Sequence, residues 1–282
     1  MNTPLIPAPA NESLPKRADL IVTTALKFDR GLEKRAKGVA RELGAHFVPR
    51  RALGMAKLFP QYPDAVRALI VQTDRMLLVS RDGHELFYHP NLAHLRMGNL
   101  LRGGRDLLID AAELRPGDSV LDGTLGYAGE AILCAHIVGD TGEVHGVEAV
   151  PELGIIVREG LQTVQTENEA LNAAMRRVRV VYLGNHLEYL RTCPDARYDV
   201  VCFDPFFDEM LHESRPMGPL RAFGDLSGLL PEAVEEARRV ARRSVIVKAE
   251  KHSTILETLG VTQFVTSKSS KVVYGVLPAI SR

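Results

Sequence analysis

The sequence contains no apolar run that approaches the ~20 residues needed to cross a bilayer. Its N-terminus lacks a basic segment followed by an apolar core, so no secretory signal is expected. Neither sign of charge is in excess, because 35 Lys and Arg residues balance 35 Asp and Glu residues, and no global field attracts the chain to nucleic acid or membrane. These absences predict a soluble, cytoplasmic protein without a membrane partner, and no stretch predicts an oligomeric state.

Cysteine is scarce, and the three cysteines have no C-x-x-C spacing. An odd number without that spacing predicts reduced thiols rather than a disulfide framework or a zinc site. Cys134 and Cys202 lie inside apolar runs, which predicts that they are buried as small hydrophobic residues. The spacing of three histidines is not that of helical metal ligands, so no catalytic metal is predicted. These histidines are His84, His89 and His94.

Positive charge does gather locally, although the whole chain is neutral. Residues 27–57 contain nine Lys and Arg residues against three Asp and Glu residues, a local excess of six positive charges. Such a segment fits a nucleic-acid partner, but a solvated helix face would have the same composition.

The chain predicts three regions. Residues 1–17 are rich in proline and polar residues, which is typical of a flexible leader. Residues 18–105 predict an α+β N-terminal domain, in which short β-like runs alternate irregularly with two amphipathic stretches. The predicted strands cover 19–24, 45–48, 67–73, 75–81 and 85–89, and the predicted helices cover 29–43 and 91–102.

Residues 106–282 have a different rhythm, in which buried strands alternate with helices. This alternation predicts a parallel sheet covered on both faces. Two final strands, at 260–266 and 271–277, are joined by only four residues, so they must pair antiparallel. The expected fold is therefore α/β, a Rossmann-like class I methyltransferase sheet that is parallel with a C-terminal antiparallel hairpin. The other predicted strands cover 119–122, 143–148, 178–183, 199–203 and 244–248, and the helices cover 130–137, 151–174, 187–191 and 232–242.

The end of the first predicted strand begins a glycine-rich loop, Asp-Gly-Thr-Leu-Gly-Tyr-Ala-Gly-Glu at 122–130. In such sheets, ligands bind beyond the carboxyl ends of the strands. The glycine spacing of three and three differs from the two-then-three of a dinucleotide fingerprint. A sulfonium cofactor has no pyrophosphate and tolerates an acid here, which favours S-adenosylmethionine. We assign Asp122, Thr124, Gly126 and Glu130 to the cofactor site.

The next two strand ends supply further polar side chains. Glu148 follows Asp122 by 26 positions, where a carboxylate can accept hydrogen bonds from both ribose hydroxyls. The third strand is followed by Asn185 and His186, and we assign the Asn185 amide to the adenine edge. Each has a structural alternative, because Glu148 could be a solvated acid before a helix and Asn185 a helix cap.

The fourth strand of the series ends in Asp204-Pro205-Phe206-Phe207. The exocyclic amine of a base is a poor nucleophile because its lone pair is delocalised into the ring. Asp204 and the Pro205 carbonyl could accept the amine hydrogens, and Phe207 could stack on the base. We therefore assign Asp204, Pro205 and Phe207 to catalysis. The alternative is that Asp204 caps the following loop and that both phenylalanines belong to the core.

The Asp-x-Thr-x-Gly loop, Glu148 and the Asp-Pro-x-Phe motif resemble the small-subunit ribosomal RNA guanine-N2 methyltransferases of the J type and a set of bacterial relatives. The resemblance covers about residues 20–277 and includes residues 22–24, 87–91, 219–221, 245–248 and 273–275. It implies S-adenosylmethionine dependence and ribosomal RNA as the partner, with guanine N2 as the target. Phe206-Phe207-Asp208 stands where the family has Met-Phe-Pro, so the details of the family's base pocket are not carried over to this chain. Arg96 and Arg221 are candidate phosphate or base contacts, or else structural ion pairs.

Three other functions remain compatible with these motifs. The chain could methylate a small amine or a protein side chain, or it could be a non-catalytic RNA-binding assembly factor. An NAD-dependent dehydrogenase is a third alternative, disfavoured by the glycine spacing and by the terminal hairpin.

Overall fold

The structure is a computed structural model that describes residues 17–90, 92–205 and 222–280. Contacts divide the chain into two units, Met1–Tyr88 and His89–Arg282. The sequence placed this boundary later, near residue 105. The difference arises because helix α3 (Ala93–Leu101), expected in the N-terminal domain, packs against helices α5 (Gly129–Val138) and α7 (Glu169–Arg177) of the second unit.

The N-terminal unit is built on a mixed sheet, in the order β2-β1-β3-β4-β5 among the described residues. Strand β1 pairs in parallel with β2 and β3, while β3, β4 and β5 pair antiparallel. Helix α1 (Arg30–Glu42) begins after Asp29, whose side chain accepts a hydrogen bond from the Leu32 amide. The short helix α2 (Met55–Leu58) was not predicted. The strands are β1 (Arg17–Thr24), β2 (Ala45–Phe47), β3 (Arg67–Val71), β4 (Met76–Ser80) and β5 (Glu85–Phe87).

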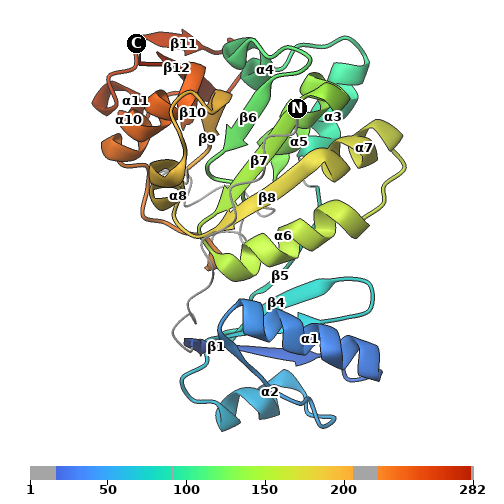
Figure 1. Cartoon of the computed structure of the whole chain (residues 1–282). Helices are drawn as coiled ribbons and strands as arrows, with labels where there is room; N and C mark the ends of the chain where they lie inside the picture. Colours follow the sequence, from blue (N-terminus) through green and yellow to red (C-terminus); the bar gives the residue numbers. More distant parts are fainter. Residues whose placement is uncertain (1–16, 91, 206–221, 281–282) are drawn as a thin grey trace. The chain divides into compact units, whose positions relative to one another are not determined.

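The second unit contains the predicted methyltransferase sheet (Figure 1). Its strands, counted over the described residues, lie in the order β11-β12-β10-β9-β6-β7-β8. Five of them run parallel, and β12 pairs antiparallel with both β10 and β11. The parallel sheet and its antiparallel hairpin are thus as expected, but the last strand is inserted between β10 and β11. The strands are β6 (Ser119–Asp122), β7 (Glu143–Glu148), β8 (Val178–Leu183), β9 (Tyr198–Phe203), β10 (Ala241–Glu250), β11 (Gln263–Val265) and β12 (Val272–Pro278).

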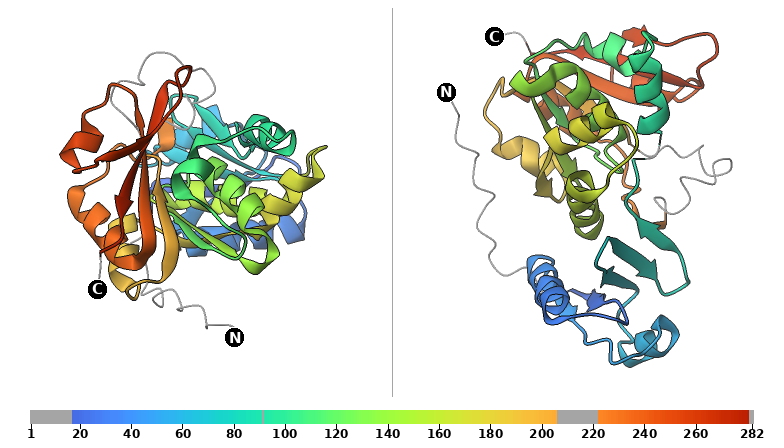
Figure 2. Two further views of the ribbon diagram at one scale, coloured as in Figure 1. Left: turned by 90° about the horizontal axis from the view of Figure 1, so that it is seen from above. Right: turned by 90° about the vertical axis from the view of Figure 1, so that its right-hand side faces the viewer.

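Helices cover both faces of this sheet (Figure 2). Helices α8 (His186–Thr192) and α10 (Pro231–Val240) pack together on one face, while α5, α6 (Pro151–Thr163) and α7 pack on the other. Helix α4 (Leu107–Ala112) and the short helix α11 (Ile255–Thr258) lie near the hairpin strands and β10. Within the described ranges, no helix is both long and apolar enough to cross a membrane.

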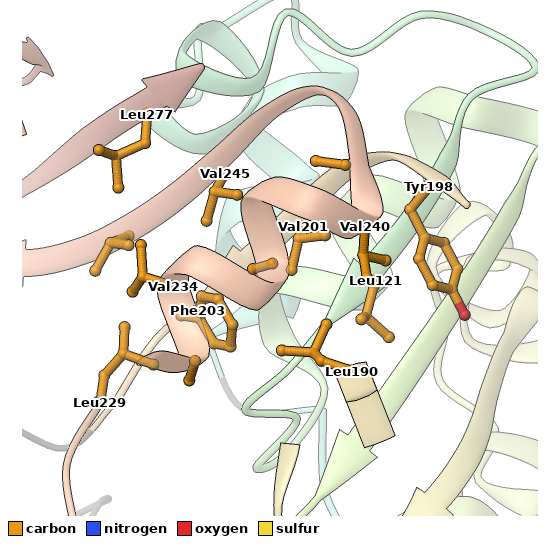
Figure 3. Packing of buried hydrophobic residues seen from close by; sticks show 14 of the residues in the cluster. Leu121, Leu190, Tyr198, Val201, Phe203, Leu229, Val234, Val240, Val245 and Leu277 are labelled. Atoms are coloured by element: carbon orange, nitrogen blue, oxygen red, sulfur yellow. The ribbon is translucent and has the colours of Figure 1, made fainter. Parts of the chain in front are cut away.

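The core beneath α10 fixes the strands that lead to the predicted site. Figure 3 shows Val201, Phe203 and Val245 of the sheet beneath Val234 and Val240 of the helix. All of these side chains are at most 2% exposed. Burial of such side chains contributes about 1.5–3 kcal/mol each. The core therefore holds the ends of β9 and β10 in a fixed position.

The predicted helix 151–174 is wrong in one respect, because the structure breaks it into α6 and α7. Asn168 caps α7 by accepting a hydrogen bond from the Leu171 amide at 3.1 Å. Asn172 closes the loop between the helices through bonds to Thr166. Polar side chains that bond the local backbone compete with a continuing helix, and apolar periodicity alone does not reveal that competition.

Arg176 of α7 also holds this break in place, because its guanidinium donates to the Leu161 carbonyl and, at 2.6 Å, to the Val164 carbonyl at the end of α6. We expect Arg176→Ala to lower the free energy of unfolding by about 1–3 kcal/mol, since it leaves these helix-terminal carbonyls without their charged donor. The neighbouring Arg177 makes an ion pair with the exposed Asp140, so Arg177→Ala should cost less than about 1 kcal/mol. Urea unfolding followed by circular dichroism measures both, and equal losses would contradict this role of Arg176.

Candidate functional site

Three of the predicted site residues lie at the ends of neighbouring strands. Asp122 ends β6 and Glu148 ends β7, while Asp204 directly follows β9. Strand β6 pairs in parallel with both β7 and β9, and Asp122 lies opposite Gly146 and Cys202 in the register. The carboxyl ends of these strands therefore meet at one edge of the sheet, where open α/β sheets bind their ligands.

The glycine-rich loop after β6 is tied to the ends of all three strands. The Gly123 amide donates to the Cys202 carbonyl at 2.9 Å, and the Leu125 amide donates to the Val147 carbonyl at 3.0 Å. The Gly126 amide donates to Glu148 Oε2 at 2.9 Å. A Cβ atom at Gly123 would come within 2.4 Å of the Phe203 ring, so only glycine lets the loop cross this close to β9.

Asp122 and Glu148 are buried carboxyl groups that have unused positions for accepting hydrogen bonds. Asp122 is 3% exposed, and its Oδ1 accepts one hydrogen bond, from the Thr124 amide at 3.0 Å. Glu148 is 5% exposed and accepts from the Gly126 and Val150 amides. An ionised carboxylate has about four acceptor positions. Both groups can therefore accept further hydrogen bonds, so they fit a ligand that carries hydroxyl groups and an ammonium group.

The pKa values of these two groups show that their charge is only partly compensated. Burial raises the pKa of Asp122 to about 8, and the nearby Glu130 carboxylate adds to the rise. Burial raises the pKa of Glu148 to about 7, against the lowering effect of its two backbone hydrogen bonds. A ligand with positive charge or hydrogen-bond donors would favour the ionised form of both.

Thr124 connects this edge to the predicted reaction site. Its Oγ1 accepts a hydrogen bond from the Asp204 amide at 2.6 Å. Pro205, the next residue, is buried. Thr124, assigned from the sequence to the cofactor, thus bonds to the backbone that begins the Asp-Pro motif. Phe207 lies outside the described residues, as does Arg221.

A partly buried network of charges lies beside Asp204. Lys248 Nζ is 2.6 Å from Asp204 Oδ2 and 3.0 Å from Glu130 Oε1. Arg96 is 2.7 Å from the Glu130 carboxylate and 2.8 Å from that of Asp106. Burial favours the neutral form of Glu130, but Lys248 and Arg96 outweigh it and lower the pKa of Glu130 to about 2. The Arg96 guanidinium thus makes the structural ion pairs that were the alternative interpretation of this residue. Glu130 is a partner in one of them.

Asn185 and His186 occupy structural positions at the start of α8. The Asn185 side chain accepts a hydrogen bond from the Leu187 amide at 2.8 Å, which is the helix-capping alternative. The ring of His186 is buried and contacts Phe203 edge-on, with the ring centroids 5.3 Å apart. The Gly184 amide donates to the Glu148 carbonyl at 2.8 Å, so this turn lies beside the end of β7.

Sequence reasoning missed several charged residues of this region. Lys248 is the most informative, because a single lysine inside the apolar run 244–249 of a central strand was itself a signal. Asp106 and Tyr274 lie beside Arg96, and nothing in their local sequence marks them. Asp225 acts electrostatically on Glu148 and His186. In the part of the chain that the structure describes, no group of three or more His, Cys, Asp or Glu side chains could hold a metal ion.

Comparison with known proteins relates the chain to methyltransferases. Residues 59–274 match the family model "Putative SAM-dependent methyltransferase". The chain is 34% identical over 257 residues to "Uncharacterized protein YpiP" of Bacillus subtilis, covering 91% of this chain and 98% of that protein. It is 27% identical over 187 residues to ribosomal RNA small subunit methyltransferase J of Magnetococcus marinus, covering 61% and 70% of the two chains.

Among solved structures, a SAM-dependent methyltransferase from Neisseria gonorrhoeae has the same fold. It superposes with a TM-score of 0.62 at 14% identity, covering 93% of this chain and 97% of that chain. The family match spans most of the chain. The chain belongs to the family of S-adenosylmethionine-dependent methyltransferases.

Proposed function

We propose that the chain methylates an exocyclic amino group of a nucleobase in RNA, with N2 of guanine as the favoured atom. The observation that carries this proposal is the position of Asp204-Pro205, at a strand end next to that of Asp122, which in turn lies next to that of Glu148. The Asp204 carboxylate and the carbonyl of Pro205, a residue without an N–H, could both accept hydrogen bonds from an amine at that point. This suits an amine as the methyl acceptor.

The cofactor would lie across the ends of β6, β7 and β8. Glu148 would accept hydrogen bonds from the ribose hydroxyls, and Asp122 with the loop amides around Gly126 would bind the amino acid part. The Asn185 amide would face the adenine edge, with His186 beside it. Thr124 and Glu130 would support this site from the loop and from the start of α5. Bound S-adenosylmethionine supplies a methyl group already activated by its sulfonium.

The main role of Asp204 would be to orient the substrate amine. Its carboxylate and the Pro205 carbonyl would accept the hydrogens of the amine, so that the nitrogen lone pair points at the methyl carbon. As the nitrogen–carbon bond forms, the methyl–sulfur bond breaks and its electron pair stays on sulfur. The proton that the nitrogen loses would pass to Asp204. Phe207 would stack on the base and hold its plane.

RNA as the substrate class has two supports. One is the relative from Magnetococcus marinus, which is a ribosomal RNA methyltransferase by name. The other is the distribution of charge: residues 1–88 contain 14 Lys and Arg residues against nine Asp and Glu residues, a net charge of +5, within a chain whose total is zero. Four exposed cations of α1, spaced for one face of the helix, form a basic stripe that suits phosphates. The basic stripe consists of Arg30, Lys34, Lys37 and Arg41.

The cofactor assignment predicts weaker binding when either buried carboxyl is neutralised. We expect Glu148→Gln and Asp122→Asn each to weaken the affinity for S-adenosylhomocysteine by about 10–100-fold, because each removes a charged acceptor. The exposed Glu257→Gln is the control and should bind like the wild type. Isothermal titration calorimetry measures all three, and thermal melting checks that the variants are folded.

The same assignment predicts that the affinity for S-adenosylhomocysteine depends on pH. The pKa values of Glu148 and Asp122 are raised to about 7 and about 8, so both groups are largely protonated at pH 6. Ligand donors bind the ionised forms, so affinity for S-adenosylhomocysteine should increase as pH rises from 6 to 8, by about tenfold. A flat profile in calorimetry would count against contact between the ligand and these carboxylates.

The reaction assignment predicts that Asp204→Asn separates chemistry from cofactor binding. We expect kcat for methyl transfer to fall by about 10²–10⁴-fold, while affinity for S-adenosylhomocysteine stays within about threefold. The substrate is ribosomal RNA from a strain that lacks the gene, and mass mapping of that RNA locates the missing methyl group. If expression of Asp204→Asn restores the modification in the strain that lacks the gene, the catalytic assignment is wrong. If only a metabolite pool or protein accepts methyl groups, the RNA substrate is wrong.

The basic stripe predicts where RNA contacts the N-terminal unit. We expect the double variant Lys34→Gln with Arg41→Gln to weaken RNA binding and to reduce the slope of log K against log salt by about 1–2. The matched control is Lys251→Gln with Lys268→Gln, two exposed lysines of the second unit. Fluorescence anisotropy at several salt concentrations measures both. Equal effects of the two pairs would refute the assignment of the stripe.

A further inference from the structure

Lys248 lies near the carboxyl end of β10, directly after the buried apolar residues 245–247. Its Nζ contacts two carboxylates, Oδ2 of Asp204 at 2.6 Å and Oε1 of Glu130 at 3.0 Å. The side chain of Lys248 is 21% exposed, so this ammonium group is largely removed from water. A lysine in such a position costs desolvation free energy unless its charge is paired.

We infer that Lys248 is a positioning residue, which orients the Asp204 carboxylate and keeps it ionised to receive the substrate amine. This inference rests on the proposed function, because it concerns how Asp204 performs its part. None of the sequence motifs that led to the proposed function includes a role for Lys248.

The geometry leaves one oxygen of Asp204 for the substrate. Oδ2 bonds to Lys248, and the Asp204 amide bonds to Thr124 Oγ1 at 2.6 Å. Oδ1 makes no hydrogen bond to any residue in the described ranges. With its backbone and one oxygen held, the carboxylate cannot rotate freely, and its second oxygen has a fixed direction. Such preorganisation is what an orienting acid requires.

Lys248 is in turn held by the groups behind it. Glu130 bridges Lys248 and Arg96, and Arg96 also pairs with Asp106, which caps α4. Tyr274 lies opposite Lys248 in the pairing of β10 with β12, and its hydroxyl is 3.5 Å from Arg96. A lysine side chain normally loses conformational entropy when it is fixed. Two carboxylates that are themselves anchored restrict its ammonium group to one place.

The charges around Asp204 explain why this cation matters. Burial raises the pKa of Asp204; Lys248 opposes that rise, the Glu130 carboxylate adds to it, and Arg96 opposes it. Burial works against the charge of Lys248 as well, but Asp204 and Glu130 outweigh it and raise the pKa of Lys248. Without Lys248, the largest effect that lowers the pKa of Asp204 would be lost, and burial and the Glu130 carboxylate would raise that pKa further. The titratable or charged groups that act on Asp204 are Lys248, Glu130, Arg96, Asp122 and Tyr274.

The direct test measures the ionisation of Asp204 in the full-length, ligand-free protein. Carboxyl carbons of aspartate are labelled with carbon-13, and Asp204→Asn identifies the Asp204 signal. We expect Lys248→Met to raise the apparent pKa of Asp204, while Lys251→Met, an exposed lysine three residues further on, leaves it unchanged. Glu130→Gln should shift it in the opposite direction, because Glu130 contributes to the rise. If Lys248→Met does not fold, the apparent pKa of Asp204 is measured in Glu130→Gln instead.

The catalytic test uses RNA methylation. For Lys248→Met we expect kcat at pH 7 to fall about tenfold or more and the acidic limb of its pH profile to move to higher pH. The KM for S-adenosylmethionine should change less than about twofold, because Lys248 contacts neither Asp122 nor Glu148. Lys248→Arg should restore the profile, since it keeps a cation beside Asp204.

The outcomes separate this inference from the proposed function. If Lys248→Met leaves both the pKa of Asp204 and the pH profile as in Lys251→Met, the inference is wrong even though RNA is methylated. If the wild type does not methylate RNA, the proposed function fails, and the pKa measurement still decides whether Lys248 controls Asp204. If kcat falls in Lys248→Met without any pKa shift and Lys248→Arg does not restore it, Lys248 has a merely structural role.

Discussion

The glycine-rich loop between β6 and α5 is the constraint on which the site depends. Its amides reach the Cys202 and Val147 carbonyls and the Glu148 carboxylate, so that one short segment fixes the ends of three strands. The approach to Phe203 leaves no room for a side chain at Gly123. Asp122, Glu148 and Asp204 each make a hydrogen bond to a residue of this loop. Asp122 and Glu148 are buried beside the loop, and this burial raises their pKa values.

Much of the fold follows from apolar patterning. The strands at 119–122, 143–148 and 178–183 are found with the predicted bounds, because each is a short segment that contains valine and has a glycine next to it. The break in 151–174 was not predicted, since it depends on Asn168, Asn172 and Arg176 bonding to particular backbone groups. The place of α3 was also misjudged, because packing against α5 and α7 is decided in three dimensions.

The sequence predicted the site residues that lie at the ends of parallel strands. It did not predict the ion pairs between residues that are far apart in the sequence. Asp122, Glu148 and Asp204 could be placed together, because parallel neighbouring strands end at one edge. Lys248 pairs with Asp204, 44 positions away, and with Glu130, 118 positions away. No local pattern encodes such distances. Arg96 was recognised as notable, but its pairing with Asp106 and Glu130 was not.

The insertion of β12 between β10 and β11 also constrains the order in which the sheet can form. Strand β10 carries Lys248, and on one side its hydrogen-bond partner is β12, made of Val272–Pro278. During synthesis the segment 263–265 emerges first but has no place to pair until β12 arrives. The edge of β10 therefore stays open until β12 has left the ribosome, a period in which an unpaired strand is prone to aggregate.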